Sequence, residues 1–218
     1  GVCGQDQRRH HSPELSGQDE WQYCLPVAGF DSADPVLKQF PQGQKEIKTD
    51  KVLIQPIYLY GSDVLRAKAQ DFDLNDREGL ATLVQDLKDT LKSSEGCGLA
   101  APQIGVSRRV LIVDGTGMTD VYPYLENFVR TMINPVIVEE SEKTTVYSEG
   151  CLSIPGVYCD VSRPASMTVE YYNEAGEKVT EVFDKFACRM IQHEMSHLDG
   201  DMFVDHVAPI RKKIIARK

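Results

Sequence analysis

The 218-residue sequence contains no uninterrupted apolar run of the roughly 20 residues that a membrane-spanning helix needs. It also lacks an Asn-x-Ser/Thr glycosylation sequence and an apolar stretch typical of a secretory signal. Positive charge is scarce, because 24 Lys and Arg stand against 33 Asp and Glu, for a net charge of -9. This balance argues against the broad electropositive surface that nucleic acids require. We therefore expect no membrane association and no direct nucleic-acid binding.

Cysteine is too sparse for a disulfide-rich scaffold, with six in 218 residues. We expect a reducing compartment, in which most cysteines are buried thiols and at least one has a functional role. The six are Cys3, Cys24, Cys97, Cys151, Cys159 and Cys188.

The chain divides into two parts by composition. Residues 1–49 are rich in Gln, Asp, Ser, Gly and Pro and show no lasting helical or alternating period. We interpret them as a polar N-terminal extension, loosely structured or docked by a few apolar anchors. Residues 50–218 are expected to form a single catalytic domain. No internal repeat is visible.

Two helices and several strands are expected in the second part. Leu80, Leu83, Val84, Leu87 and Leu91 recur at three- and four-residue steps, which predicts a helix over 75–94 with Asn75 or Asp76 as its N-cap. β-rich runs follow at 108–114, 131–139, 144–148 and 166–173, the last forming a hairpin with 179–183. A second helix is predicted over 186–198. Strand runs followed by a helix indicate an α+β fold, with antiparallel sheets packed around that helix.

The sequence QHEMSHL at 192–198 gives this second helix an H-E-x-x-H motif. Residues four apart lie on the same helix face, so His193 and His197 can bind one cation with Glu194 beside them. The glutamate of such a motif can act as a base toward metal-bound water. The alternative is an ordinary helix on which two polar residues happen to recur.

A catalytic metal usually takes three protein ligands, so two histidines leave the site incomplete. No third His or Glu follows at the spacing of common metalloproteases, and His206 is more typical of a loop. Cys151, in YSEGCLSIPG, is the better candidate because turn residues surround it and a thiolate would give a Cys-His-His site with room for water. The alternative for Cys151 is a buried, unreactive thiol.

A third stretch, EGCGLAAPQIGV at 95–106, is rich in Gly and Ala, whose small side chains leave the backbone accessible. Such a segment suits close approach by an extended substrate that adds as a strand. Gln103 would supply a neutral donor for a carbonyl oxygen. Taken alone, the stretch is as typical of a tight turn.

Together the three stretches resemble peptide deformylase. The family motifs G-x-G-L-A-A-P-Q, E-G-C-L-S and Q-H-E-x-D-H-L correspond here to GCGLAAPQ (96–103), EGCLS (149–153) and QHEMSHL (192–198), in the same order. The resemblance extends over about residues 50–210. It implies the deformylase fold and removal of the formyl group from the N-terminal formyl-methionine of new polypeptides.

The resemblance also implies residue roles. Cys151, His193 and His197 would bind one divalent metal, natively Fe(II), with Zn, Ni or Co as substitutes. Glu194 would be the general acid and base. The formyl oxygen would be bound by Gln103 and the backbone N–H of Leu152, and the peptide backbone by Gly98. The walls of the methionine pocket would include Cys97 and Met190, although Met190 is as typical of a core residue.

One residue departs from the family pattern: Ser196 stands where Asp is usual. It is not at a ligand position, but loss of a carboxylate there would remove a contact that orients the ligands. Glu149, in the second motif, is expected to fix the Cys151 loop through a buried ion pair or backbone hydrogen bonds, with Arg189 as a candidate partner.

Two other functions would use the same motifs. An H-E-x-x-H metallopeptidase would cleave unformylated peptides and would take a carboxylate or His as its third ligand. A non-catalytic deformylase-like protein would only bind formylated N-termini. A purely structural zinc site would need a fourth ligand. The expected partners are N-formylmethionyl nascent chains in a bacterial-type cytoplasm, while ribosome association and an organellar location stay open.

Overall fold

The computed structural model describes residues 53–94 and 96–207. The predicted extension at 1–49 and the last residues of the chain lie outside these ranges. The described residues form helices α1 (Arg77–Ser94) and α2 (Lys185–Leu198). Their strands are β1 (Gly98–Ala100), β2 (Val110–Asp114), β3 (Val129–Glu140), β4 (Thr144–Cys151), β5 (Ile154–Pro164), β6 (Ser166–Tyr172) and β7 (Lys178–Asp184).

Helix α1 begins where its sequence predicted. Asp76 is the N-cap, because its Oδ1 accepts a hydrogen bond from the backbone N–H of Gly79 at 2.9 Å. All five residues of the predicted apolar face are buried: Leu80, Leu83, Val84, Leu87 and Leu91. This face, rather than intrinsic propensity, accounts for most of the helix's stability.

The main sheet has five antiparallel strands in the order β1-β2-β3-β6-β7. Successive side chains of β2 point to opposite faces, and both faces are covered. Leu111 and Val113 pack in the apolar cluster that includes residues of α2, whereas Val110 and Ile112 pack in the cluster of α1. The two helices therefore cover opposite faces of this part of the sheet.

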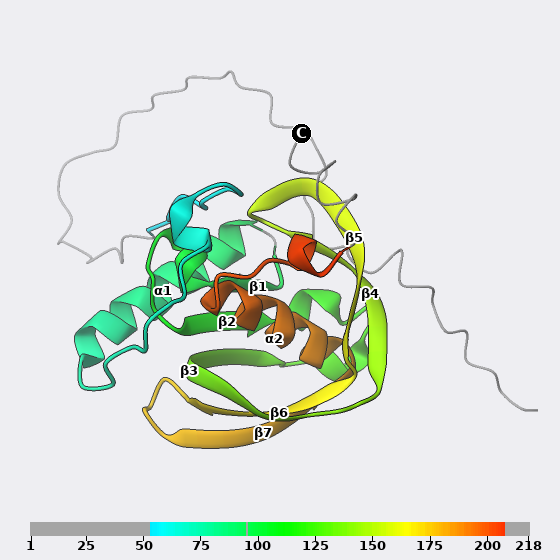
Figure 1. Cartoon of the computed structure of the whole chain (residues 1–218). Coiled ribbons are helices and arrows are strands. Elements are labelled where there is room, and N and C mark those ends of the chain that lie inside the picture. The colour runs from blue at the N-terminus through cyan, green and yellow to red at the C-terminus, as the bar shows by residue number, and fades with distance from the viewer. Residues whose placement is uncertain (1–52, 95, 208–218) are drawn as a thin grey trace, which may run out of the picture.

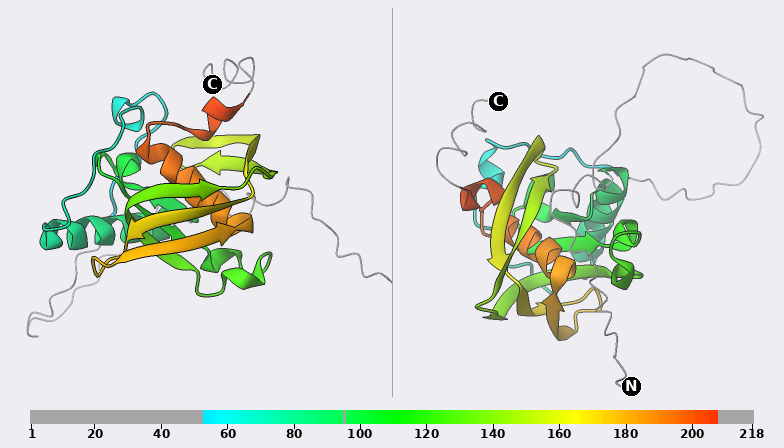
Figure 2. Two further views of the ribbon diagram at one scale, coloured as in Figure 1. Left: turned by 60° about the horizontal axis from the view of Figure 1, so that its bottom comes forward. Right: turned by 90° about the vertical axis from the view of Figure 1, so that its right-hand side faces the viewer.

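Strands β4 and β5 form a separate antiparallel pair. Figure 1 and the right-hand view of Figure 2 show α2 running between this pair and the five-stranded sheet. Of the 14 residues of α2, 12 are buried. The predicted α+β fold with antiparallel sheets around the H-E-x-x-H helix is thus confirmed.

Several element boundaries differ from those predicted. Strands β1 and β5 were not predicted, and β4 continues beyond 148 to Cys151. The connection between β2 and β3 contains two short 3-10 helices at Thr116–Met118 and Pro123–Leu125. Met118 and Leu125 are buried, so part of this segment closes the core. No helix in the described part of the chain is long and apolar enough to cross a membrane.

Candidate metal and catalytic site

Helix α2 presents His193 and His197 on one inward face. Their ring centroids are 5.1 Å apart, and only 4% of His193 and 1% of His197 is exposed. The separation follows from the helix geometry, in which residues four apart lie one turn above each other.

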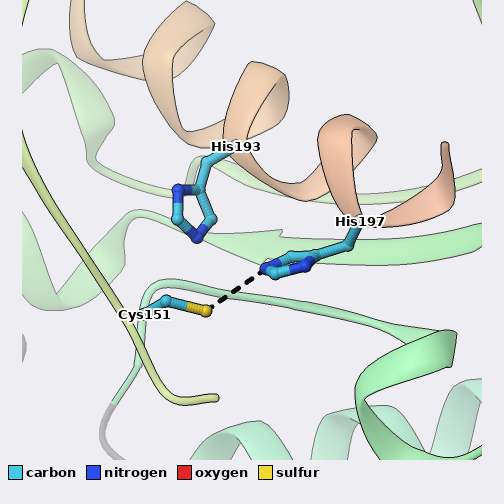
Figure 3. A group of neighbouring side chains, drawn as sticks. All are labelled: Cys151, His193 and His197. Carbon is cyan, nitrogen blue, oxygen red and sulfur yellow. Dashed lines mark hydrogen bonds between the residues drawn. The ribbon is translucent and has the colours of Figure 1, made fainter. Parts of the chain in front are cut away.

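Cys151 reaches the histidines from the end of β4, where the chain turns into β5. Its Sγ lies 3.3 Å from His197 Nε2 (Figure 3). The ligand atoms of Cys151, His193 and His197 all lie within 4.8 Å of one another. A tetrahedral ion with one thiolate and two imidazole ligands would hold sulfur and nitrogen about 3.5 Å apart. The donor set and its spacing therefore fit one transition-metal ion such as Fe(II) or Zn(II).

The protonation of the two imidazoles differs. Burial lowers the pKa of His197 well below its usual value, so its ring is neutral and offers a lone pair. Burial also lowers the pKa of His193, but hydrogen bonds with Cys151 and Glu149 outweigh it and raise that pKa to about 10. Metal ligands must be deprotonated, so a cation would replace the proton that His193 holds in this arrangement.

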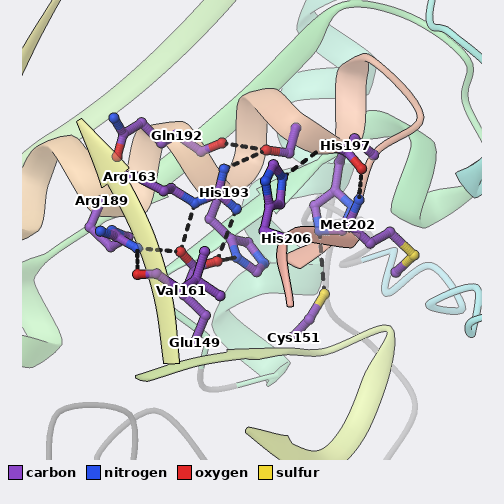
Figure 4. A network of polar contacts seen from close by, with 12 residues as sticks. Glu149, Cys151, Val161, Arg163, Arg189, Gln192, His193, His197, Met202 and His206 are labelled. Atoms are coloured by element: carbon purple, nitrogen blue, oxygen red, sulfur yellow. Dashed lines mark hydrogen bonds and ion pairs between the residues drawn. The ribbon is translucent and has the colours of Figure 1, made fainter. Parts of the chain in front are cut away.

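Glu149 organises the charged groups behind the histidines (Figure 4). Its fully buried carboxylate forms ion pairs of 2.7 Å with Arg163 and with Arg189. It also lies 2.8 Å from Nδ1 of His193, which leaves Nε2 of that ring to face the site. The predicted ion pair between Glu149 and Arg189 is confirmed, and Arg163 is a second partner.

Ser196 also contacts Arg163. The Arg163 Nη1 donates to Ser196 Oγ at 2.9 Å, and Ser196 Oγ donates to the Gln192 carbonyl at 3.0 Å. The carboxylate expected from the family pattern is absent, but its place beside the arginine is taken by a hydroxyl. The guanidinium therefore donates to a neutral acceptor instead of a carboxylate, and the Glu149–Arg163 ion pair remains.

The Glu194 side chain lies beside Cys151 and His193 in the same small cavity. A Cβ on Gly98 would lie 2.5 Å from Glu194 Oε1, so the carboxylate lies directly against the bare Cα of this glycine. Its Oε2 is buried and has no hydrogen-bond partner among the described residues. Burial raises the pKa of Glu194 to about 7, against the opposing charge of His193. A carboxyl group with this pKa can accept and return a proton near neutral pH.

Gln103 is held in one orientation. Its Oε1 accepts from the backbone N–H of Ala100 at 2.9 Å, which turns Nε2 toward Cys151 Sγ (3.6 Å) and Ser153 Oγ (3.2 Å). Gln103 is only 1% exposed. Its amide NH2 group is therefore a hydrogen-bond donor held in a fixed position beside Cys151.

A small cavity joins these groups. It has a volume of about 30 Å³, enough for a water molecule. It brings together seven of the predicted site residues, namely Cys97, Gly98, Gln103, Cys151, Leu152, His193 and Glu194. His197 does not line this cavity, but it contacts Cys151, which does. Met190 does not line this cavity; it is buried one turn before His193 on α2, and its Cε would lie 3.3 Å from a Cβ on Gly115.

Sequence reasoning missed two residues of the site. Arg163 is buried because β5 alternates, with Cys159, Val161 and Arg163 all facing inward. The sequence signal was the spacing: Arg163 stands two residues after Val161 and four after Cys159, on the strand face that these apolar residues occupy. A buried arginine on that face requires an ion-pair partner. The second missed residue, Ser153, donates its backbone N–H to Cys151 Sγ at 3.4 Å.

Fold and site together define a metal-dependent hydrolase, in which a central H-E-x-x-H helix supplies two histidines and the end of β4 supplies a cysteine. The family model described as "Polypeptide deformylase" matches residues 54–213. The "Peptide deformylase" of Fusobacterium nucleatum subsp. nucleatum is 38% identical over 168 residues, 76% of this chain and 91% of that protein.

Solved structures agree with these sequence matches. A peptide deformylase from Legionella pneumophila superposes with a TM-score of 0.69 at 33% identity, covering 76% of this chain and 93% of that one. A Met-Ala-Ser-bound class I type b peptide deformylase from Acinetobacter baumannii gives 0.65 at 32% identity, covering 72% and 99%.

The chain belongs to the peptide deformylase family, whose members are metal-dependent enzymes. It is a hydrolase that removes the formyl group from the N-terminal formyl-methionine of polypeptides. The comparisons give no support to a metallopeptidase or to a non-catalytic binder.

Proposed function

We propose that Cys151, His193 and His197 hold one divalent cation, natively Fe(II), and that Glu194 moves the protons of the deformylation reaction. The observation that carries this assignment is the meeting of three donor atoms within 4.8 Å beside a buried carboxylate. A thiolate with two imidazoles suits Fe(II) as well as Zn(II), Ni(II) or Co(II).

A cation at this site would polarise the formyl carbonyl and lower the pKa of a water molecule toward about 7. Glu194 takes a proton from the water that attacks the formyl carbon. It then gives the proton to the departing amine, because the C–N bond breaks only when nitrogen becomes a good leaving group. Its raised pKa, about 7, and the unpartnered Oε2 support both steps.

Gln103 and the backbone N–H of Leu152 bind the formyl oxygen as it becomes negatively charged. The support for Gln103 is its fixed amide, which faces Cys151 at 3.6 Å while Ala100 holds its other end. One such preorganised donor contributes about 3 kcal/mol to transition-state stabilisation in comparable sites.

The substrate is an N-formylmethionyl polypeptide, whose backbone hydrogen-bonds to Gly98. Cys97 and Met190 contribute to the wall that accepts the methionine side chain. Residues 50–218 act as one catalytic domain, preceded by the polar extension 1–49. We place the reaction in a bacterial-type cytoplasm, on nascent chains as they leave the ribosome.

The ligand assignment is tested by a matched pair of cysteine variants. Cys151 and Cys159 are both buried on the β4–β5 pair, but the group of donor atoms that could hold a metal includes Cys151 and not Cys159. In protein prepared without oxygen, Cys151→Ala should fall from about one metal per chain to almost none and lose formate release. Cys159→Ala should keep both. A Cys151→Ala protein that retains one metal per chain would contradict the assignment.

A further inference from the structure

A groove of about 640 Å³ lies beside the catalytic cavity, between the C-terminal end of α1 and strands β2 and β3. Its floor is apolar and includes the buried side chains of Leu91, Ile112 and Met118. Lys88 and Lys92, one turn apart on α1, lie along its rim. Nothing in the proposed reaction uses this groove.

The groove continues directly from the catalytic cavity. Gly96 and Cys97 line both spaces. A substrate with its formyl group beside Glu194 and its backbone along Gly98 has two directions in which to leave. Toward the C-terminal end of β1 the way is closed, because Leu99, Ala100 and Ala101 are completely buried. The chain must therefore leave past the half-buried Gly96.

Strand geometry fixes which substrate residues arrive at the groove. An extended substrate chain advances about 3.3 Å per residue, so its third residue lies about 6.6 Å beyond its first. Gly96 stands two residues before Gly98, just outside β1. If the formylated methionine lies level with Gly98, the third substrate residue lies level with Gly96. The fourth and later residues then enter the groove.

The charges of the rim favour acidic residues at these positions. Lys88 already has a partner, since its Nζ lies 2.6 Å from Glu174 Oε1. Lys92 is exposed and has no carboxylate within 4.0 Å among the described residues. Asp114 also lines the groove, and its Oδ1 accepts hydrogen bonds from the backbone N–H and the hydroxyl of Thr116 at 2.9 and 2.6 Å. The attraction for an acidic substrate residue therefore comes from Lys92. Its attraction for an acid will be modest and screened by salt.

We propose that this groove binds the residues after the third of the formylated polypeptide and selects for acidic side chains there. The proposal rests on the deformylase function given above and extends it to substrate selection. The apolar floor contacts the aliphatic parts of these acidic side chains and any apolar substrate residues beside them. Lys92 interacts with the carboxylates. The enzyme thereby distinguishes nascent chains by residues that never approach the reacting carbon.

The test compares three substrates: formyl-Met-Ala-Ser, and two heptapeptides, formyl-Met-Ala-Ser-Ala-Asp-Asp-Ala and its Lys-Lys counterpart. At low salt, the wild-type kcat/KM should be about threefold to tenfold higher for the Asp-Asp peptide than for the Lys-Lys peptide. Lys92→Glu should abolish or reverse this ratio and leave kcat/KM for the tripeptide unchanged. The matched control is Lys143→Glu, an exposed lysine on the β3–β4 connection, away from the groove.

The outcomes are distinct. A ratio that moves no more in Lys92→Glu than in Lys143→Glu would overturn the proposal, as would an equal change with the tripeptide and the heptapeptides. A ratio in the wild type that does not shrink in 0.5 M salt would also contradict an electrostatic origin. Failure of the wild type to release formate from the tripeptide would instead contradict the proposed function itself.

Discussion

At the scale of single residues, the closest packing in the site is between Glu194 and Gly98. Glu194 Oε1, Cδ and Cγ would all lie within 2.8 Å of a Cβ on Gly98, closer than real Cβ contacts allow. The atoms that a Cβ would meet all belong to the Glu194 side chain, so the carboxylate would have to move aside. The glycine is needed here for space, because it lets the carboxylate lie directly beside the strand.

Gly98→Ala should therefore displace the Glu194 carboxylate and lower kcat for formyl-Met-Ala-Ser on the order of a hundredfold, the effect of misplacing a catalytic group by about 1 Å. The three atoms nearest to that Cβ all belong to Glu194 and none to a proposed metal ligand, so the metal content should stay near one per chain. Gly117→Ala is the control, because a Cβ there meets nothing within 4 Å. Equal kcat values for the two variants would refute this account of Gly98.

The sequence predicted single residues well where a short motif carries the chemistry. Helical spacing alone predicted that His193 and His197 share a face, and the structure confirms this with rings 5.1 Å apart. The contact between Ser196 and Arg163 could not be predicted, because it joins residues 33 positions apart, one on α2 and one on β5. Its geometry depends on tertiary packing, which local patterns do not encode.

At the scale of elements, Glu149 ties three segments together. It lies in β4, Arg163 in β5, and Arg189 and His193 in α2. Arg189 also donates to the carbonyls of Val161 and Thr145, both at 2.8 Å. The carboxylate thus holds the β4–β5 pair, which carries Cys151, against the helix that carries the histidines.

Replacing this carboxylate leaves two arginines buried without their counter-charge. Glu149→Gln should lower the free energy of unfolding by about 3 to 5 kcal/mol, the usual effect of breaking a buried ion pair. Urea unfolding of the metal-free protein measures the change. The control is Glu142→Gln, an exposed glutamate between β3 and β4, which should change stability by less than about 0.5 kcal/mol. A similar effect of the two substitutions would contradict the role of Glu149.

The same carboxylate predicts a pH dependence. Burial raises the pKa of Glu149, but hydrogen bonds and charges of His193 and Arg163 outweigh it and hold the pKa far below the ordinary value of 4.5. Because the folded pKa is lower than the unfolded one, its contribution to stability is complete above about pH 4.5 and is lost as the pH falls further. Between pH 5 and pH 3, wild-type stability should fall more steeply than that of Glu149→Gln.

Elements were predicted from the sequence with uneven success. Helix α1 and the hairpin of β6 and β7 follow from long, regular periods. Strand β1 has only three residues, too few for any period to be visible, and it is a strand because it pairs with β2. Strand β5 contains Pro155 and Gly156, residues that usually mark a turn, and its alternation is clear only further along.

At the scale of the whole molecule, three distant stretches of sequence converge on one cavity. Residues 96–103 come from β1 and the 3-10 helix Ala101–Ile104, 149–153 from the end of β4 and the turn after it, and 192–198 from α2. Only the packing of both sheets around α2 brings them together. We propose that Glu194, in the middle of this convergence, moves the protons of formyl hydrolysis, while Cys151, His193 and His197 hold the metal without it.

The most direct test is formate release from formyl-Met-Ala-Ser by Glu194→Gln, prepared without oxygen and with its bound metal counted. The account predicts one metal per chain and a kcat about 10² to 10⁴ times lower than that of the wild type, because only the proton-transferring group is lost. A Glu194→Gln protein that keeps its metal and releases formate at the wild-type rate would contradict the account.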